Sequence, residues 1–182
     1  MTISQKIKSG QIGVMPTDTI YGIVGSALMS HVVERIYRVR KRDPKKPFIV
    51  LISKTEELSQ FGVTVDLETS KLLNSVWPGP TSVILPCHNA EFEYLHRGTK
   101  TIAFRLPNEN DLIELILETG PLVAPSANLE GALPAETIDE AKRYFGNKID
   151  FYVDGGILSG APSKIAKIEN SKLVYPVRSR DR

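Results

Sequence analysis

Residues 40–47 read Arg-Lys-Arg-Asp-Pro-Lys-Lys-Pro and hold five cations and two prolines. Proline fixes its own φ and lacks a backbone N–H, so a helix cannot continue through this stretch, and we expect a rigid basic loop. Arginine presents a planar fork of donors and lysine a mobile point charge, and such a loop can bind a polyanion. The alternative is a solvated turn without a ligand, because runs of charge are most often ordinary surface.

The segments on either side of this loop predict how it is held. Residues 30–39 place their apolar side chains one helical turn apart, a spacing typical of an amphipathic helix. Residues 48–52, Phe-Ile-Val-Leu-Ile, have the composition of a buried strand. The basic loop is therefore expected between two packed elements.

Length and composition bound the class of protein. A chain of 182 residues suits one substantial domain. With 41% hydrophobic and 24% charged residues, it is typical of a globular protein in water. No apolar run approaches the roughly 20 residues of a membrane span. The net charge of +2 is too small to indicate a nucleic-acid binder, so any electrostatic argument depends on clustering.

Cysteine and histidine usage favours a reducing compartment. Residues 1–6 lack the apolar core of a signal peptide, and the single Cys87 cannot form an internal disulfide. A cytoplasmic location is the expectation. His31, His88 and His96 follow no known ligand spacing, so we predict surface histidines and no metal-binding side chains.

Strands and helices are expected to interleave along the chain. Apolar patterning predicts strands at 11–15, 48–52, 82–85, 101–107, 121–124, 151–153, 164–168 and 173–175, and helices at 4–9, 30–39, 55–61, 67–76, 109–119 and 137–145. Asn108 is expected to cap the helix that follows it, and residues 86–98 to form a surface excursion. This alternation predicts an α/β fold, in which ligands bind in the crevice at the strand ends.

Several polar segments adjoin these predicted strands. Residues 16–22, Pro-Thr-Asp-Thr-Ile-Tyr-Gly, carry hydroxyls and a carboxylate, and residues 125–128, Pro-Ser-Ala-Asn, combine small and polar side chains. Arg105 ends a strand and needs an anion or water. Residues 77–80, Trp-Pro-Gly-Pro, form a stiff corner whose tryptophan is expected in the core. Because neither a Walker nor a Rossmann glycine pattern is present, arginine and lysine would have to grip phosphate in a basic, hydroxyl-lined cleft.

Read together, these motifs closely resemble the YrdC-like threonylcarbamoyl-AMP synthase family. The resemblance covers nearly the whole chain, including residues 103–107 and 160–163. It implies a single domain over residues 1–182, a twisted open mixed α/β sheet with flanking helices around a basic cleft, and a tail from about residue 176 that could be mobile. It also implies synthesis of threonylcarbamoyl-AMP and pyrophosphate from L-threonine, bicarbonate (or carbon dioxide) and ATP. The product feeds the threonylcarbamoyl modification of adenosine next to the anticodon of tRNA.

The resemblance assigns roles to individual residues. For threonine binding it implies Thr19, Arg105, Ala124 and Ser163. For nucleotide binding it implies Arg40, Arg42, Lys46, Thr101, Ser126, Asn128 and Arg178, the last of these closing over the nucleotide from the tail. Arg42 and Lys46 contact the triphosphate and are the predicted catalytic residues.

The chain departs from the usual family pattern at five positions. Arg40 stands where lysine is common, Asp43 where proline is common, and Glu130 where serine is usual. Leu51 occupies a position that is histidine in many relatives, and Lys164 one that is usually threonine. The resemblance places these last two beside the threonine site, so the details of amino-acid recognition stay open.

The implied chemistry agrees with the residue types. Attack of a carbamate oxygen on the α-phosphate brings two anions together, so cations at the transition state are the catalyst required, with Mg²⁺ sharing the pyrophosphate charge. No nucleophilic side chain is needed. The sequence does not identify the general base.

Two other functions stay open. A basic concave surface also suits double-stranded RNA or tRNA, which would make the chain a binding module without catalysis. A carbamoyl-transfer enzyme related to hydrogenase-maturation proteins is a second alternative. The lack of an acylphosphatase-like or zinc-finger segment argues against it.

Overall fold

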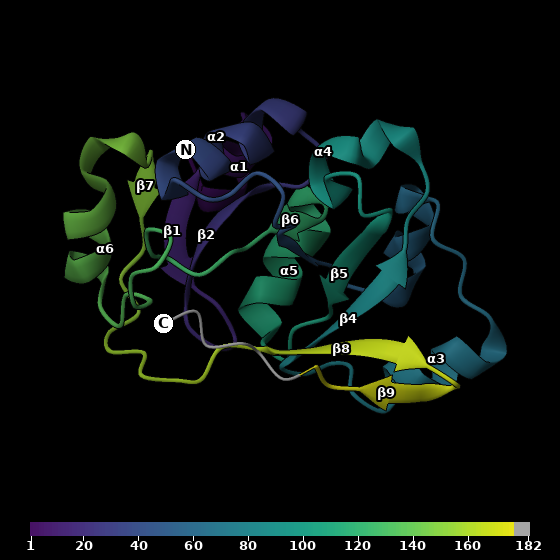
Figure 1. Ribbon diagram of the computed structural model, residues 1–182. Helices are drawn as coiled ribbons and strands as arrows, with labels where there is room; N and C mark the ends of the chain where they lie inside the picture. The colour runs from purple at the N-terminus through teal and green to yellow at the C-terminus, as the bar shows by residue number, and fades with distance from the viewer. Residues whose placement is uncertain (177–182) are drawn as a thin grey trace.

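One mixed sheet runs through the structure, a computed structural model that describes residues 1–176. Within this range nine strands lie in the order β7-β1-β2-β6-β3-β5-β4-β8-β9, with parallel and antiparallel neighbours. The strands are β1 Gly13–Pro16, β2 Tyr21–Ser26, β3 Ile49–Leu51, β4 Thr81–Pro86, β5 Thr101–Arg105, β6 Leu122–Val123, β7 Phe151–Tyr152, β8 Lys164–Glu169 and β9 Lys172–Val174. The predicted α/β class and mixed sheet are confirmed (Figure 1).

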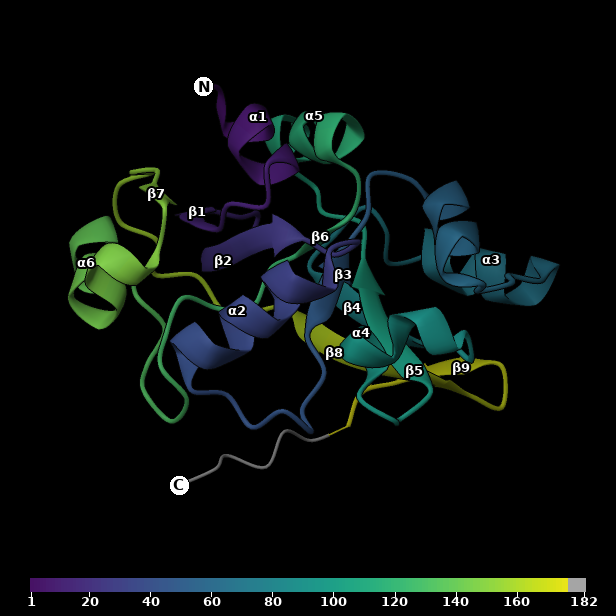
Figure 2. The ribbon, with the colours of Figure 1, turned by 90° about the horizontal axis from the view of Figure 1, so that it is seen from above.

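Helices flank the sheet on both faces. They are α1 Ile3–Lys8, α2 Ser30–Arg40, α3 Leu67–Asn74, α4 Glu93–His96, α5 Asn110–Thr119 and α6 Ile138–Phe145, with 3₁₀ turns η1 Thr55–Phe61, η2 Ala90–Phe92 and η3 Gly146–Lys148. Seen from above, α1 and α5 lie on one side of the strands and α2 and α4 on the other (Figure 2). None of the helices in residues 1–176 is long and apolar enough to cross a membrane.

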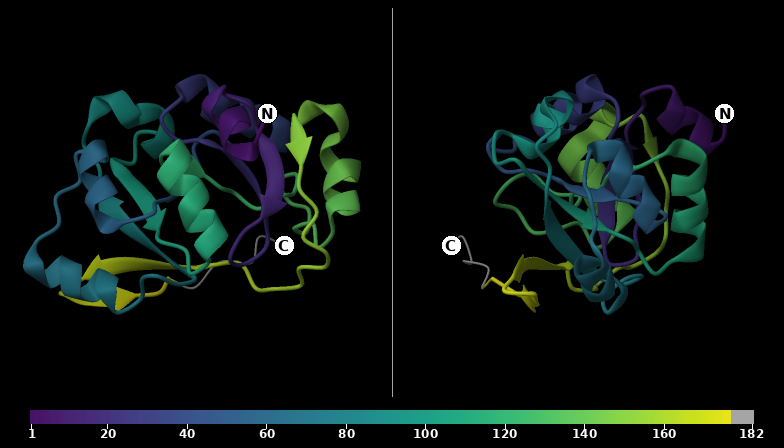
Figure 3. Two further views of the ribbon diagram at one scale, coloured as in Figure 1. Left: turned by 180° about the vertical axis from the view of Figure 1, so that it is seen from behind. Right: turned by 90° about the vertical axis from the view of Figure 1, so that its right-hand side faces the viewer.

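Strand alternation divides the buried side chains between two cores. In β3, Val50 packs in the core that α2 and α6 join, whereas Leu51 packs in the core that α1 and α5 join. Ile49 lies on the Leu51 face but is only half-buried, at the margin of that second core. Figure 3 shows α1 and α5 together over one part of this face. The rest of the face is available for the cavities described below.

Backbone conformation defines where the basic loop begins. Lys41 has φ 52°, in the left-handed region, and ends α2, while the N–H of Arg42 donates to the carbonyl of Tyr37 at 3.0 Å. Residues 30–39 and 48–52 form a helix and a strand as predicted, so the loop does lie between two packed elements. Trp77 is buried and donates its Nε1–H to the carbonyl of Thr81 at 2.7 Å, as expected of a core residue.

Strand β2 is absent from the sequence prediction. All six of its residues are buried, and glycines at 22 and 25 break the apolar pattern. A side chain at Gly25 would put its Cβ 2.6 Å from Val32, so α2 packs directly on the strand at this point. Gly25, which interrupts the apolar pattern of β2 in the sequence, is thus also the residue that allows α2 to approach the strand.

Three local predictions are wrong. Residues 86–98 contain η2 and α4, and His96 is buried with its Nδ1 accepting from the Gly98 N–H at 3.1 Å, so it is not a surface histidine. Leu95, the residue before His96, is also buried, so this segment packs against the core. The cap of α5 is Glu109 in place of Asn108, because the Glu109 carboxylate accepts from the N–H groups of Asp111 and Leu112.

Candidate active site

Two adjoining cavities open on the sheet. The smaller, of about 380 Å³, is called the polar pocket here; it is lined by residues that include Thr19, Arg40, Arg42, Arg105, Ala124, Ser126 and Ser163. The larger, of about 850 Å³, is called the apolar groove; it is lined by residues that include Ile84, Leu85, Thr99, Thr101, Ala103 and Lys167. Pro47, Ile49 and Ile165 line both cavities. The two cavities therefore adjoin at a shared wall, and together they form a cleft that gathers most of the predicted site residues.

Aromatic stacking and hydrogen bonds hold the basic loop against this cleft. The rings of Tyr37 and Phe48 stack with centroids 3.9 Å apart, and the Arg42 guanidinium lies 5.9 Å from the Phe48 centroid. The carbonyl of Lys46 accepts from the Tyr37 hydroxyl at 2.9 Å and from Arg42 Nε at 3.5 Å. Arg42 lines the polar pocket from a loop that is supported at both ends.

Removing the Tyr37 hydroxyl should loosen this loop. If the basic loop binds ATP as the resemblance implies, Tyr37→Phe should lower kcat/KM for ATP about fivefold, because a hydrogen bond of about 1 kcal/mol no longer fixes the Lys46 carbonyl that accepts from Arg42. The ring stack stays, so the melting temperature should change little. Steady-state kinetics in ATP and in threonine check this. An equal loss for both substrates, or none for ATP, would contradict the assigned support.

Glu130 joins the basic loop to the loop that follows β6. Its carboxylate accepts from the Asp43 N–H at 2.5 Å and pairs with Lys46 Nζ at 3.0 Å. The Asp43 N–H, together with the charges of Lys46 and Arg42, holds the pKa of Glu130 below its ordinary value. Glu130 thus takes part in positioning Lys46, which lies on the loop without lining either cavity.

Arg40 is hydrogen-bonded to the Ser-Ala-Asn turn at residues 126–128. It is 3% exposed, and its Nε donates to the Asn128 carbonyl while Nη2 donates to Asn128 Oδ1, at 2.9 and 2.8 Å. Burial first, and then the charge of Arg42, lower the pKa of Arg40 to about 10. Asn128 also donates to the carbonyls of Leu129 and Ala132. Arg40 and Asn128 therefore shape the pocket wall that presents Ser126.

A second arginine reaches the pocket from β5. Arg105 is 3% exposed, and its Nη2 lies 2.9 Å from Asp18 Oδ1 on the turn between β1 and β2. Burial lowers the pKa of Arg105, and the charge of Asp18 opposes that change. On the same turn the Thr17 hydroxyl donates to the Ile20 carbonyl at 2.7 Å and lies 3.3 Å from the hydroxyl of Thr19. The turn thereby places the Thr19 hydroxyl at the pocket.

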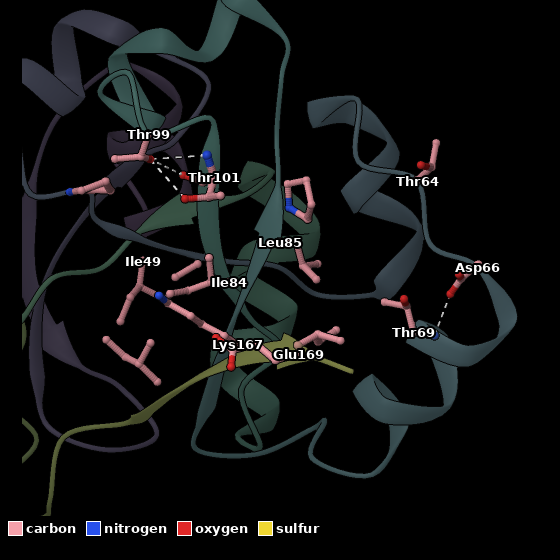
Figure 4. A pocket seen from close by; sticks show the side chains of 15 residues that line it. Ile49, Thr64, Asp66, Thr69, Ile84, Leu85, Thr99, Thr101, Lys167 and Glu169 are labelled. Atoms are coloured by element: carbon pink, nitrogen blue, oxygen red, sulfur yellow. Dashed lines mark hydrogen bonds between the residues drawn. The ribbon is translucent and has the colours of Figure 1, made fainter. Parts of the chain in front are cut away.

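The other predicted site residue of β5 lines the apolar groove. Thr101 lines it with Ala103, so the predicted polar face of this strand faces the cleft, while Ile102 and Phe104 are fully buried. Figure 4 shows Ile49, Ile84 and Lys167 together at one end of the groove, and Thr64, Asp66 and Thr69 at the other. The groove has room and apolar surface for a flat ring system.

Comparison with known proteins decides the family. The model of the Sua5/YciO/YrdC family, described as "Telomere recombination", matches residues 5–178. The chain belongs to the Sua5/YciO/YrdC family. That membership confirms the predicted resemblance.

Three relatives are named for the same activity. The threonylcarbamoyl-AMP synthase of Pyrococcus abyssi is 31% identical over 151 residues, which are 82% of this chain and 44% of that protein. The synthase of Bacillus subtilis is 30% identical, again over 82% of this chain and 44% of the relative. A putative synthase of Methanocaldococcus jannaschii is 30% identical over 94% of this chain and 81% of its own length. The chain thus spans less than half the length of the P. abyssi and B. subtilis relatives.

Solved Sua5/YciO/YrdC structures share the fold. P. abyssi Sua5 complexed with L-threonine aligns with a TM-score of 0.83 and 29% identity, over 90% of this chain and 49% of that one. Escherichia coli YciO aligns with a TM-score of 0.81 over 94% of this chain and 84% of that one, and at 24% identity it supports the fold alone.

Two positions that depart from the family pattern lie outside the cleft lining. Leu51 is fully buried in the core beneath α1 and α5, and Lys164 is exposed at the start of β8. Arg178 lies outside the described residues. Sequence reasoning missed the contributions of Asp18 and Tyr37. A clue to Asp18 was available, since a strand-end arginine needs an anion and a carboxylate stood in the motif at residues 16–22.

Proposed function

We propose that this chain is an L-threonylcarbamoyladenylate synthase, which forms threonylcarbamoyl-AMP and pyrophosphate from L-threonine, bicarbonate or carbon dioxide, and ATP. The observation that carries the proposal is a pair of adjoining cavities, in which three arginines and a set of hydroxyls lie beside an apolar groove. A phosphate ester with a flat base and an amino acid together have this pattern of charge and apolar surface. The family membership and the names of the relatives support the same reaction.

The cleft divides between the two larger substrates. Arg105 would bind the threonine carboxylate, and Thr19, Ala124 and Ser163 would surround the rest of the amino acid, all four lining the polar pocket. Supporting this placement, the named P. abyssi relative binds L-threonine in its structure. The threonine amine, after losing its proton to water, would combine with bicarbonate to give a carbamate and water, or with carbon dioxide to give a carbamate and a proton.

The nucleotide would occupy the other side of the cleft. Arg42 and Lys46 would contact the triphosphate, and Ser126, in the wall built by Arg40 and Asn128, would hold the nucleotide nearer its base. The base would extend along the apolar groove beside Thr101. Arg178, which is outside the described residues, stays a predicted contact that closes over the nucleotide.

The chain's own contribution to the reaction is positioning and charge. The carbamate oxygen attacks the α-phosphorus, the bond to the bridging oxygen breaks, and pyrophosphate leaves. Arg42 and Lys46 would stabilise the charge that develops on the phosphate oxygens, and Mg²⁺ would arrive with ATP as its counter-ion. The product would pass to the machinery that transfers the threonylcarbamoyl group to tRNA. The proposed location of this protein is the cytoplasm.

A product assay tests this proposal. Protein with labelled bicarbonate, threonine and ATP–Mg²⁺ should release pyrophosphate and form a labelled adenylate only when all three substrates are present. Pyrophosphate release that is independent of threonine would point to another acceptor. No labelled adenylate at any substrate concentration would overturn the proposed function.

Ligand-linked melting separates the synthase from an RNA-binding module. ATP–Mg²⁺ and threonine should each raise the melting temperature, and each should tighten binding of the other, because both bind only the folded cleft. RNA should bind weakly, with little sequence preference and a steep loss of affinity with salt. Tight RNA binding at physiological salt, with neither small molecule shifting the melting temperature, would favour the module.

A further inference from the structure

Asp18 lies behind the site, outside the cleft. Its neighbours Thr17 and Thr19 line the polar pocket, as does Arg105, but Asp18 is not part of the lining of either cavity in the described chain. The Asp18 and Arg105 side chains are each only 4% exposed and form an ion pair of 2.9 Å. Arg105 therefore lines the pocket, whereas the carboxylate paired with it does not.

The Asp18 carboxylate is itself fixed by three elements. It belongs to the turn between β1 and β2, pairs with the end of β5, and faces the backbone N–H of Asn108 just before α5. Burial raises the pKa of Asp18, while the charge of Arg105 and the backbone N–H groups of Asp18 and Asn108 oppose the rise; Glu109 is the other charged group that acts on it. A carboxylate held in this way is a stable anchor for the guanidinium.

Arg105 retains an unused donor. Its Nη2 is taken by Asp18, whereas its Nε is buried and has no acceptor among residues 1–176. The Nε atom itself has no accessible surface, so an anion in the polar pocket would meet the part of the guanidinium that lines that pocket.

We propose that Asp18 is a positioning residue for amino-acid recognition: it holds one edge of the Arg105 guanidinium so that the part of the group that lines the polar pocket faces the carboxylate of the substrate. This inference rests on the proposed function, which places the threonine carboxylate at Arg105. Asp18 acts through Arg105 and touches no substrate. Its effect is therefore confined to the amino acid and absent from the nucleotide.

Steady-state kinetics of Asp18→Asn test the proposal. Asparagine keeps the size and one acceptor oxygen but loses the charge that anchors Arg105. We expect the threonine KM to rise about tenfold, with the ATP KM within about twofold of wild type, because a hydrogen bond between charged groups is weakened at one substrate only. In an Arg105→Ala background, Asp18→Asn should raise the threonine KM no further, since the residue through which it acts is gone.

Asp150→Asn is the matched control. Asp150 pairs with Arg35 and accepts from the Ile12 N–H away from the cleft, so the change also removes a charge from an ion pair but should leave both KM values unaltered. If Arg105→Ala does not fold, the KM split between Asp18→Asn and Asp150→Asn carries the test alone. Equal rises in both KM values, an unchanged threonine KM, or a further rise in the Arg105→Ala background would each overturn the inference. A wild-type protein that forms no threonine-dependent product would overturn the proposed function, and this inference with it.

Discussion

Arg42→Ala should lower kcat/KM for adenylate formation by about a thousandfold, the lower end of what an arginine contributes at a transferring phosphoryl group. Arg42 lines the polar pocket from the basic loop, and its guanidinium packs beside Phe48 where a triphosphate would approach. Its cation would stabilise the charge on the phosphate oxygens in the transition state more than in bound ATP, so the loss should fall mainly on kcat.

The fold of Arg42→Ala should stay intact. The side chain is partly exposed and makes one long hydrogen bond, at 3.5 Å, so the melting temperature should change by only a degree or two. Lys45→Ala is the control, because it removes a cation from an exposed position on the same loop. It should retain nearly full activity. Near-normal activity of Arg42→Ala, or an equal loss in Lys45→Ala, would refute the phosphate role.

Arg105→Ala should raise the threonine KM about a hundredfold and leave the ATP KM nearly unchanged, because the proposed charge-assisted contact with the threonine carboxylate would be lost. It should also destabilise the protein by about 3–5 kcal/mol, since Asp18 would be left as a buried charge without its partner. Kinetics in each substrate and thermal unfolding measure the two effects separately.

Arg105→Lys separates the role of Arg105 in threonine recognition from its role in the stability of the protein. Lysine keeps a cation opposite Asp18 but lacks the planar fork of donors that could bind Asp18 and a substrate carboxylate together. The threonine KM should still rise at least tenfold, while most of the stability should be regained. Arg105→Lys with a wild-type threonine KM, or Arg105→Ala with equal losses for threonine and ATP, would show that Arg105 is not the carboxylate contact.

The sequence alone predicted the parts that depend on neighbouring residues. Prolines and charge at residues 40–47 were enough to predict a basic loop, because they act on their own stretch of backbone. Period-two alternation placed Thr101 and Arg105 on one face of β5, and that face lines the cleft. The α/β class followed from the order of the same local patterns, and the resemblance spanning the separated motifs predicted the family.

Tertiary structure decided which polar groups meet. Asp18 and Arg105 are 87 positions apart, and Arg40 and Asn128 are 88 apart, so no local pattern could pair them. Their pairing depends on a sheet order in which β2, β6, β3 and β5 are successive neighbours, and on β2, whose glycines concealed it. The sequence therefore determined which charges the site has. The sheet determined which of these charged groups pair with each other and which lie at the cleft. The reason is that a buried charge is stable only beside a partner, and the fold decides which partner lies within reach.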